Sequence, residues 1–162
     1  AYAAIDTARQ AGVKVSFDTN LRLKLWSIDR ARAVMSDVIA RSDLCLPSYD
    51  DVVAITGLTD PDALVDHCLR LGANVVALKL GEQGALIADS HQRHRIAPHP
   101  CQPVDATGAG DLFAAGFLFG HVRGRSLQDC LRLGSICAAE IISHYGARPE
   151  ANLQALVAEK MG

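Results

Sequence analysis

Short apolar stretches and longer amphipathic stretches alternate along this chain, and this alternation limits the possible folds more than any other feature. The periodicity of apolar residues predicts strands in the first kind of stretch and helices in the second. Strand and helix alternating in this way predict a mostly parallel sheet with helices on both faces, in a single α/β domain over residues 1–162. Ligands of such sheets bind beyond the carboxyl ends of the strands. This rule selects the loops after Asp18, Leu46 and Leu80, and the glycine-rich turn before Asp111.

Cap and stop residues place the individual elements. Gly12 is a natural helix stop, Ser27 a helix cap, and Pro47 closes a strand. We expect helices up to about residue 11, at 28–42, 48–57 and 60–72, from the glycine turn to about 121, at 126–143, and after 149. We expect strands at 13–18, 43–47 and 74–81, and a hairpin formed by 84–90 and 93–97.

The composition of the chain excludes several classes of function. With 162 residues, of which 49% are hydrophobic, the chain can bury one domain-sized core. Its net charge of -2, without long blocks of like charge, argues against a nucleic-acid-binding surface and a membrane-surface helix. No apolar run approaches the roughly 18 residues that a membrane span needs, and no signal segment opens the chain. We therefore expect a cytoplasmic protein, with neither nucleic acid nor membrane as a partner.

The five cysteines are an odd number, widely spaced and without a Cys-x-x-Cys pair. This pattern predicts reduced, buried thiols and not a disulfide framework or a zinc site. Cys130 and Cys137 lie seven residues apart within a helical pattern, so we expect both on one face of a helix, in the core.

The stretch VDATGAGDLFAAGFLFG, residues 104–120, places an acid behind three small residues at the start of an apolar helix. Gly108, Ala109 and Gly110 let a ligand approach the backbone, and the free N–H groups of a helix N-terminus form an anion site. Asp111, held ionised by the helix dipole, could accept a proton there, as phosphoryl transfer to a hydroxyl requires. The alternative interpretation is that Asp111 only complements the helix dipole.

Two other glycine motifs do not fit this stretch. A dinucleotide-binding G-x-G-x-x-G needs a small residue where Phe113 stands, and no strand ending in an acid follows. A P-loop needs Gly-Lys-Ser/Thr after its glycines, and none follows. These mismatches disfavour an oxidoreductase and a P-loop NTPase.

Four segments resemble a known family in the family's own order and together cover nearly the whole chain. DATGAGDLFAAGF resembles the second signature of the ribokinase-like (PfkB) carbohydrate kinases, with its first residues rearranged. FDTNLRLKLW resembles the D-P-N-x-R-x-x-L-W stretch of 2-keto-3-deoxygluconate kinases (2-dehydro-3-deoxygluconokinases), with Thr19 in place of proline. LPSYDDVVAITG resembles the P-N/S-x-x-E segment, and VVALKLGEQGALI resembles the strand and turn that carry the nucleotide. The resemblance implies a ribokinase-like three-layer α/β/α fold with a mostly parallel sheet, of which this chain is the C-terminal portion.

The resemblance also implies roles for residues of the glycine turn and of the strand at 74–81. Asp111 would be the catalytic base and would contact the substrate, and the backbone of Gly108, Ala109 and Gly110 would form the anion hole. The segment from Lys79 to Gly84 would wrap the nucleotide, and the residues expected to bind it are Lys79, Leu80, Gly81 and Gly84. Lys79 could equally be a solvated residue at the end of a strand.

Further implied residues follow the first two predicted strands. Asn20 and Arg22 would face the phosphates and the substrate, and the planar guanidinium of Arg22 matches the carboxylate of a sugar acid. The alternative for Arg22 is a surface arginine in a polar loop. Ser48 and Asp51 occupy the N-x-x-E positions, which help to hold Mg²⁺ through water. Both side chains are shorter than the usual ones, so Asp51 could instead be an acid at a helix start.

Together these observations predict an ATP- and Mg²⁺-dependent kinase for a sugar or sugar acid, with 2-keto-3-deoxygluconate as the leading substrate. A kinase for a neutral sugar or nucleoside, and a non-catalytic nucleotide-binding fragment, remain as alternatives. The opening AYAAIDTARQAG is already the interior of an amphipathic helix without a cap, so we expect the C-terminal part of a longer polypeptide. Without the N-terminal substrate and lid part, we expect the isolated chain to be poorly active and its exposed sheet edge to favour self-association as a homo-oligomer.

Overall fold

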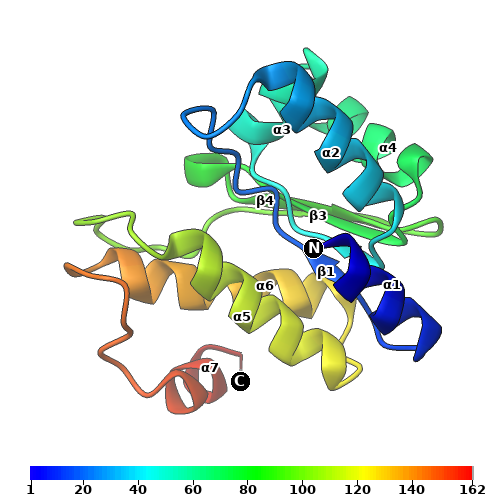
Figure 1. Ribbon diagram of the computed structural model, residues 1–162. Helices are drawn as coiled ribbons and strands as arrows, with labels where there is room; N and C mark the ends of the chain where they lie inside the picture. Colours follow the sequence, from blue (N-terminus) through cyan, green and yellow to red (C-terminus); the bar gives the residue numbers. More distant parts are fainter. Residues whose placement is uncertain (162) are drawn as a thin grey trace. The chain divides into compact units, whose positions relative to one another are not determined.

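The computed structural model describes residues 1–161 (Figure 1). Its helices are α1 (Tyr2–Gln10), α2 (Ile28–Ala40), α3 (Tyr49–Thr56), α4 (Pro61–Leu71), the 3₁₀ turn η1 (Gly81–Gln83), α5 (Ala109–Val122), α6 (Leu127–Ile142) and α7 (Leu153–Met161). Its strands are β1 (Ser16–Phe17), β2 (Leu44–Cys45), β3 (Val75–Lys79), β4 (Ala85–Ala88) and β5 (Arg93–Ile96). Every predicted helix and strand is present, in the predicted order.

The five strands form one sheet in the order β1-β2-β3-β4-β5. β1 pairs in parallel with β2, with Ser16 opposite Leu44, and β2 pairs in parallel with β3, with Leu44 opposite Val75. The prediction of a mostly parallel sheet is therefore confirmed. β1 and β2 are each two residues long, shorter than the strands predicted at 13–18 and 43–47, because the ladder that pairs them covers only Ser16–Phe17 and Leu44–Cys45.

The predicted hairpin is present as β4 and β5, which are neighbours in the sheet. The backbone N–H of Asp89 donates to the carbonyl of Gln92 at 3.0 Å. The Asp89 carboxylate accepts from the backbone N–H groups of His91 at 2.7 Å and Gln92 at 2.8 Å. Aspartate favours such turns because its short side chain can bond the backbone two residues further on.

The backbone contacts divide the chain into two compact units. The N-terminal unit contains Ala1–Leu80 and Leu86–Arg93, and the C-terminal unit contains Gly81–Ala85 and the residues from His94 onward. In the N-terminal unit, α2, α3 and α4 pack together beside the strands (Figure 1). Buried side chains from these helices and from β2, β3 and β4 form its core, among them Ile39, Val52, Leu64 and Leu78.

Side-chain caps fix the starts of the helices at the predicted places. The Ser27 hydroxyl accepts from the N–H of Arg30 at 3.4 Å, and the Asp60 carboxylate accepts from the N–H of Ala63 at 2.8 Å. Each cap satisfies an N–H group that has no partner within its helix. The first cap is the one that the sequence predicts at residue 27.

In the C-terminal unit, α5 and α6 lie side by side and α7 packs against α6 (Figure 1). The two long helices approach closely because glycines stand at their contact. A Cβ atom added to Gly116 of α5 would lie 2.5 Å from the carbonyl oxygen of Leu133 on α6. Phe117 of α5 is fully buried, and α5 carries the glycine turn that precedes it.

All five cysteines are free thiols. Cys45, Cys68, Cys130 and Cys137 are buried, and the last two lie on α6 as expected. The prediction of burial is wrong for Cys101, which is exposed because it lies in the irregular segment between β5 and α5.

Candidate functional site

The carboxyl ends of the three parallel strands meet in one polar cluster in the N-terminal unit. Asp18 and Thr19 directly follow β1, Ser48 forms a parallel bridge with Lys79 at the end of β3, and Asp51 lies in the first turn of α3. The rule that ligands bind beyond strand ends selects these loops, and the fold places their polar side chains in contact with one another.

A single carboxylate oxygen organises the loop after β1. The hydroxyl of Thr19 donates to Oδ2 of Asp51 at 2.7 Å, and the backbone N–H of Leu21 donates to the same oxygen at 3.1 Å. Between these two anchors, Asn20 adopts a left-handed backbone with φ of 41°, the one positive φ of a non-glycine residue in the described chain. Asparagine tolerates this conformation better than most residues. The exposed Asn20 side chain thus stands at the tip of a fixed turn.

Lys79 makes an ion pair within this cluster. Its Nζ lies 2.7 Å from Oδ2 of Asp18, and the two side chains are only 13% and 29% exposed. The predicted alternative of a solvated lysine at a strand end does not describe this environment. The ammonium group instead ties the end of β3 to the end of β1, and its contribution to nucleotide binding stays a prediction.

Arg22 lies on the same loop with its side chain exposed. Its guanidinium donates to the carbonyl of Leu21 at 2.9 Å, which uses one of its five N–H donors. Asn20, Arg22 and Trp26 line a groove of about 860 Å³ in the N-terminal unit, whose other walls are largely apolar side chains of α1, β1 and α2. Arginine at such a groove can bind an anionic group of a small molecule.

The turn after β3 contains the other predicted nucleotide-binding residues. Leu80 belongs to the core of the N-terminal unit, whereas Gly81 and Gly84 belong to the C-terminal unit. Gly84 has φ of 86°, and a Cβ atom there would lie 2.0 Å from the carbonyl oxygen of Ile96. Only glycine fits this position, because backbone atoms of residues 96–98 occupy the space beside it.

The glycine turn of the C-terminal unit has the features of an anion site. Gly108 is the N-cap of α5 with φ of 82°, and its neighbour Ala109 donates its N–H to the carbonyl of Ala106 at 3.2 Å. Among the described residues, the backbone N–H groups of Gly108, Gly110 and Asp111 have no acceptor. Of the three residues of the predicted anion hole, Ala109 thus has its N–H engaged, whereas those of Gly108 and Gly110 are available, and the anion hole itself stays a prediction.

Asp111 lies in the first turn of α5 with an exposed side chain. A carboxylate at this position can accept a proton from a hydroxyl group, and the neighbouring N–H groups can stabilise negative charge that develops on a phosphoryl group.

Asp105 holds the turn in place, a role that sequence reasoning missed. Its carboxylate accepts from the N–H and hydroxyl of Thr107 at 2.9 and 2.7 Å and from the N–H of Gly146 at 3.1 Å. These hydrogen bonds, first of all that from the Thr107 hydroxyl, lower the pKa of Asp105. The Asp-x-Thr spacing is a signal for the local part of this arrangement, but the bond to Gly146 has no signal in the sequence.

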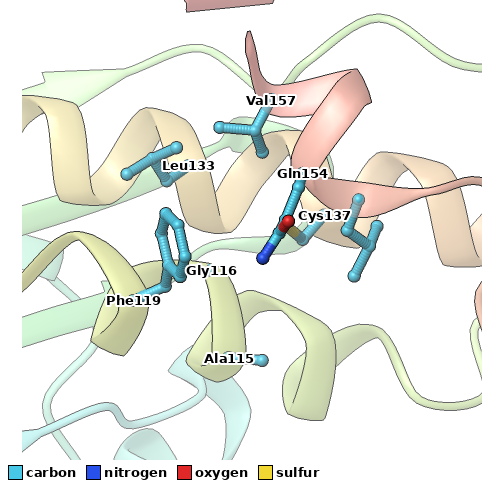
Figure 2. Close-up of a pocket in the computed structure, with 8 residues that line it drawn as sticks. Ala115, Gly116, Phe119, Leu133, Cys137, Gln154 and Val157 are labelled. Atoms are coloured by element: carbon cyan, nitrogen blue, oxygen red, sulfur yellow. The ribbon is translucent and has the colours of Figure 1, made fainter.

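A separate small cavity lies between α5, α6 and α7 (Figure 2). It measures about 170 Å³, and Phe119, Leu133 and Val157 from the three helices converge on it. Its walls are almost entirely apolar, and burial raises the pKa of its one thiol, Cys137. None of the predicted site residues lines this cavity, so we assign it no part in the chemistry.

The donor set fits a magnesium ion that is held mainly by nucleotide phosphates. No group of three or more His, Cys, Asp or Glu residues gathers at a metal-binding distance anywhere in residues 1–161. Oδ2 of Asp51 accepts two hydrogen bonds, which leaves Oδ1 for contact with a metal-bound water. Mg²⁺ commonly keeps several waters and takes one or two carboxylates plus substrate phosphates. Asp51 is compatible with that mode.

Among the described residues, no helix combines the length and apolar character that a membrane crossing requires.

Comparison with known proteins gives consistent matches over nearly the whole chain. A family model described as "pfkB family carbohydrate kinase" matches residues 1–153. The chain is 33% identical over 148 residues to 2-dehydro-3-deoxygluconokinase of Haemophilus influenzae, covering 88% of this chain and 47% of that protein. It is 34% identical over 140 residues to cytidine kinase of Thermococcus kodakarensis, covering 85% of this chain and 50% of that protein. The chain thus spans about half the length of the curated relatives it matches.

The fold also matches that of solved structures. Fructokinase from Vibrio cholerae, solved with fructose, ADP and a calcium ion bound, superposes with a TM-score of 0.84 at 26% identity, over 96% of this chain and 54% of that one. Structural neighbours of this kind confirm the prediction of a ribokinase-like fold.

Proposed function

Because the chain belongs to the pfkB family of carbohydrate kinases, we propose that it is the nucleotide-binding, C-terminal part of a sugar kinase that transfers a phosphoryl group from ATP to a sugar acid. The observation that carries the proposal is Asp111, an exposed acid at the N-terminus of α5 beside the unpaired N–H groups of Gly110 and Asp111. A base next to an anion site is the arrangement that phosphorylation of a hydroxyl requires.

In the proposed reaction, the substrate hydroxyl loses its proton to the carboxylate of Asp111 as its oxygen attacks the γ-phosphorus of ATP. The bond between that phosphorus and the β-γ bridging oxygen breaks, and ADP leaves with the electron pair. The N–H groups at the start of α5 stabilise the charge on the transferring phosphoryl oxygens. A magnesium ion, when bound, neutralises charge on the phosphates, and Asp51 would hold one of its waters.

The loop after β1 supports a sugar acid as the substrate, with 2-keto-3-deoxygluconate as the specific proposal. Arg22 lies exposed at the groove of that loop, and a guanidinium binds a carboxylate through two parallel hydrogen bonds. One of the similar relatives is named as a 2-dehydro-3-deoxygluconokinase, the kinase for this sugar acid.

A kinase for a neutral sugar or nucleoside is the second candidate. A cytidine kinase is as similar in sequence, and a structural neighbour binds the neutral sugar fructose. The glycine turn serves either substrate, so the groove with Arg22 is the feature that separates the candidates. A non-catalytic nucleotide-binding protein is the third candidate, and nucleotide binding without turnover by the full-length protein would support it.

The test is ADP release with ATP and Mg²⁺ by the full-length kinase and by this chain alone, with 2-keto-3-deoxygluconate, ribose, fructose and cytidine in turn. We expect selective turnover of the sugar acid by the full-length protein, and little by the isolated chain. Selective turnover of a neutral substrate would contradict the proposed substrate while keeping the kinase assignment. Absence of turnover with every substrate would contradict the kinase assignment itself.

A further inference from the structure

We propose that Thr19 and Asp51 are positioning residues that set the shape of the loop Asn20–Arg22, and through it the selectivity for a carboxylate-bearing sugar. This inference rests on the proposed function, since it names the residues that hold Arg22 for its substrate. Neither residue needs to contact the substrate for this role.

The geometry of the loop supports the proposal. Thr19 is a polar residue with only 3% of its surface exposed, and its hydroxyl is satisfied on both sides. It donates to Oδ2 of Asp51 at 2.7 Å and accepts from the N–H of Ser48 at 3.4 Å. A buried hydroxyl with its full set of partners fixes the backbone that carries it, because breaking either bond would leave a buried polar group unpaired.

The anchor extends from Asp51 to Arg22 through the backbone of Leu21. The N–H of Leu21 donates to Asp51 at 3.1 Å, and its carbonyl accepts from the guanidinium of Arg22 at 2.9 Å. Residues 19 and 21 are thus both held by one oxygen atom, and Asn20 between them is forced into the left-handed region. Such a conformation persists where the surrounding contacts over-determine it, which is a feature of ligand-binding segments.

Charge in the cluster supports the same role. The ion pair between Asp18 and Lys79 lies next to Thr19 in the chain, and it neutralises the second carboxylate at this strand end. The charged groups near the loop include Asp51, which accepts its hydrogen bonds, the paired Asp18 and Lys79, and Arg30, which lines the same groove as Arg22. The guanidinium of Arg22 makes no ion pair within the described residues and can attract an anionic substrate.

Position 19 distinguishes this chain from the pattern that the loop resembles. A proline there could neither donate to Asp51 nor accept from Ser48, so the hydrogen bonds of Thr19 replace the stiffness of a proline ring. The side chain of Asp51 is one methylene group shorter than a glutamate, and in the structure it meets the hydroxyl of Thr19 at hydrogen-bonding distance. Threonine in place of proline at position 19 and aspartate in place of glutamate at position 51 are therefore compatible, because their side chains form this hydrogen bond.

The experiment uses the full-length kinase and compares Thr19→Val, which keeps the shape but removes the hydroxyl, with Thr19→Ser, which keeps the hydroxyl. The matched control is Thr56→Val, which removes the hydroxyl that bonds Val52 within α3. KM and kcat are measured for the sugar acid and for ATP, and backbone amide exchange is measured at Leu21. Thr19→Val should raise KM for the sugar acid by about tenfold, a loss expected from a misplaced charge-assisted contact. It should raise KM for ATP by less, through Asn20 of the same loop.

We further expect faster amide exchange at Leu21 in Thr19→Val, and values close to wild type in Thr19→Ser and Thr56→Val. An unchanged KM for the sugar acid in Thr19→Val, with the wild type active, would overturn the positioning role and leave the proposed function intact. An equal loss on all substrates together with a lower melting temperature would also overturn it, since a merely structural role predicts that result. If the wild type does not phosphorylate any sugar acid, both proposals fail together.

Discussion

Asp105 accepts a hydrogen bond at 3.1 Å from the backbone N–H of Gly146, 41 residues further along the chain. The same carboxylate bonds Thr107 just before the glycine turn, so one side chain ties the start of α5 to the segment that follows α6. The turn that precedes Asp111 is thereby held both by a neighbouring residue, Thr107, and by a residue far along the chain, Gly146. Pre-organised donors act on a transition state without reorganisation, which is why this anchoring matters for catalysis.

We expect Asp105→Asn to lower kcat/KM by about ten- to a hundredfold, because a misplaced turn misaligns the N–H groups of the anion site. The matched control is Asp89→Asn, since Asp89 makes a similar pair of backbone hydrogen bonds in the hairpin turn. Steady-state kinetics of both variants provide the measurement. Equal effects of the two substitutions would show that the loss reflects general destabilisation and not the position of Asp105.

Replacement of Lys79 by methionine should destabilise the N-terminal unit. The substitution leaves Asp18, which is 29% exposed, without its partner at a largely buried strand end. We expect a loss of about 1–3 kcal/mol in the free energy of unfolding, measured by urea denaturation. Lys14→Met is the control, because the ion pair of Lys14 with Asp43 involves a lysine that is 71% exposed. A larger effect for Lys14→Met would contradict the structural weight given to the Lys79 pair.

Gly116→Ala should destabilise the contact between α5 and α6. The added methyl group would lie 2.5 Å from the carbonyl oxygen of Leu133, a backbone atom that cannot move without shifting the helix. Overpacking of this kind costs about 1–3 kcal/mol, measurable as a lower midpoint of thermal or urea unfolding. Gly124→Ala is the control, because a Cβ atom added at Gly124 would meet no atom within 4 Å. Only the positive φ of Gly124 opposes that substitution.

The stability of the C-terminal unit should depend on His144 near neutral pH. Burial acts to lower the pKa of His144, but hydrogen bonds to the carbonyl of Tyr145 and the carboxylate of Glu140, and the charge of Glu150, outweigh it and raise the pKa above 6.5. A raised pKa in the folded state means that the contribution to stability is present below about pH 6.5 and is lost as the pH rises through the raised value.

Urea unfolding of the wild type and of His144→Gln at several pH values between about 5.5 and 8.5 tests this dependence. The wild type should be more stable than the variant at the acidic end, and the difference should shrink toward the alkaline end. A difference that grows with pH would contradict the direction of the shift.

The sequence predicts most of the fold because the relevant signals are local. Apolar periodicity and the cap at Ser27 predict where helices lie, and cap geometry depends on residues three apart. The lengths of β1 and β2 are a different case, because they depend on pairing between segments that lie far apart in the sequence, such as Ser16 with Leu44 and Leu44 with Val75.

The sequence predicts which residues belong to the candidate site, but it does not predict which of them contact one another. The strand-end rule brings together the loops of Arg22, Ser48 and Lys79, yet the pairing of Lys79 with Asp18 spans 61 residues. In the sequence, Thr19 is distinguished only as a residue that stands where the resembled pattern has proline. Its bond to Asp51 depends on the tertiary position of α3, which no local pattern reports.

The most direct test of the central claim is the turnover of Asp111→Asn in the full-length kinase, measured as ADP release beside nucleotide affinity. The control is Asp129→Asn, which alters the corresponding first-turn acid of α6. If Asp111 is the base, its substitution lowers kcat by about 10²- to 10⁴-fold while nucleotide affinity and the control stay close to wild type. Near-normal turnover of Asp111→Asn would contradict the assignment, and Asp111 would then be an acid that only complements the dipole of α5.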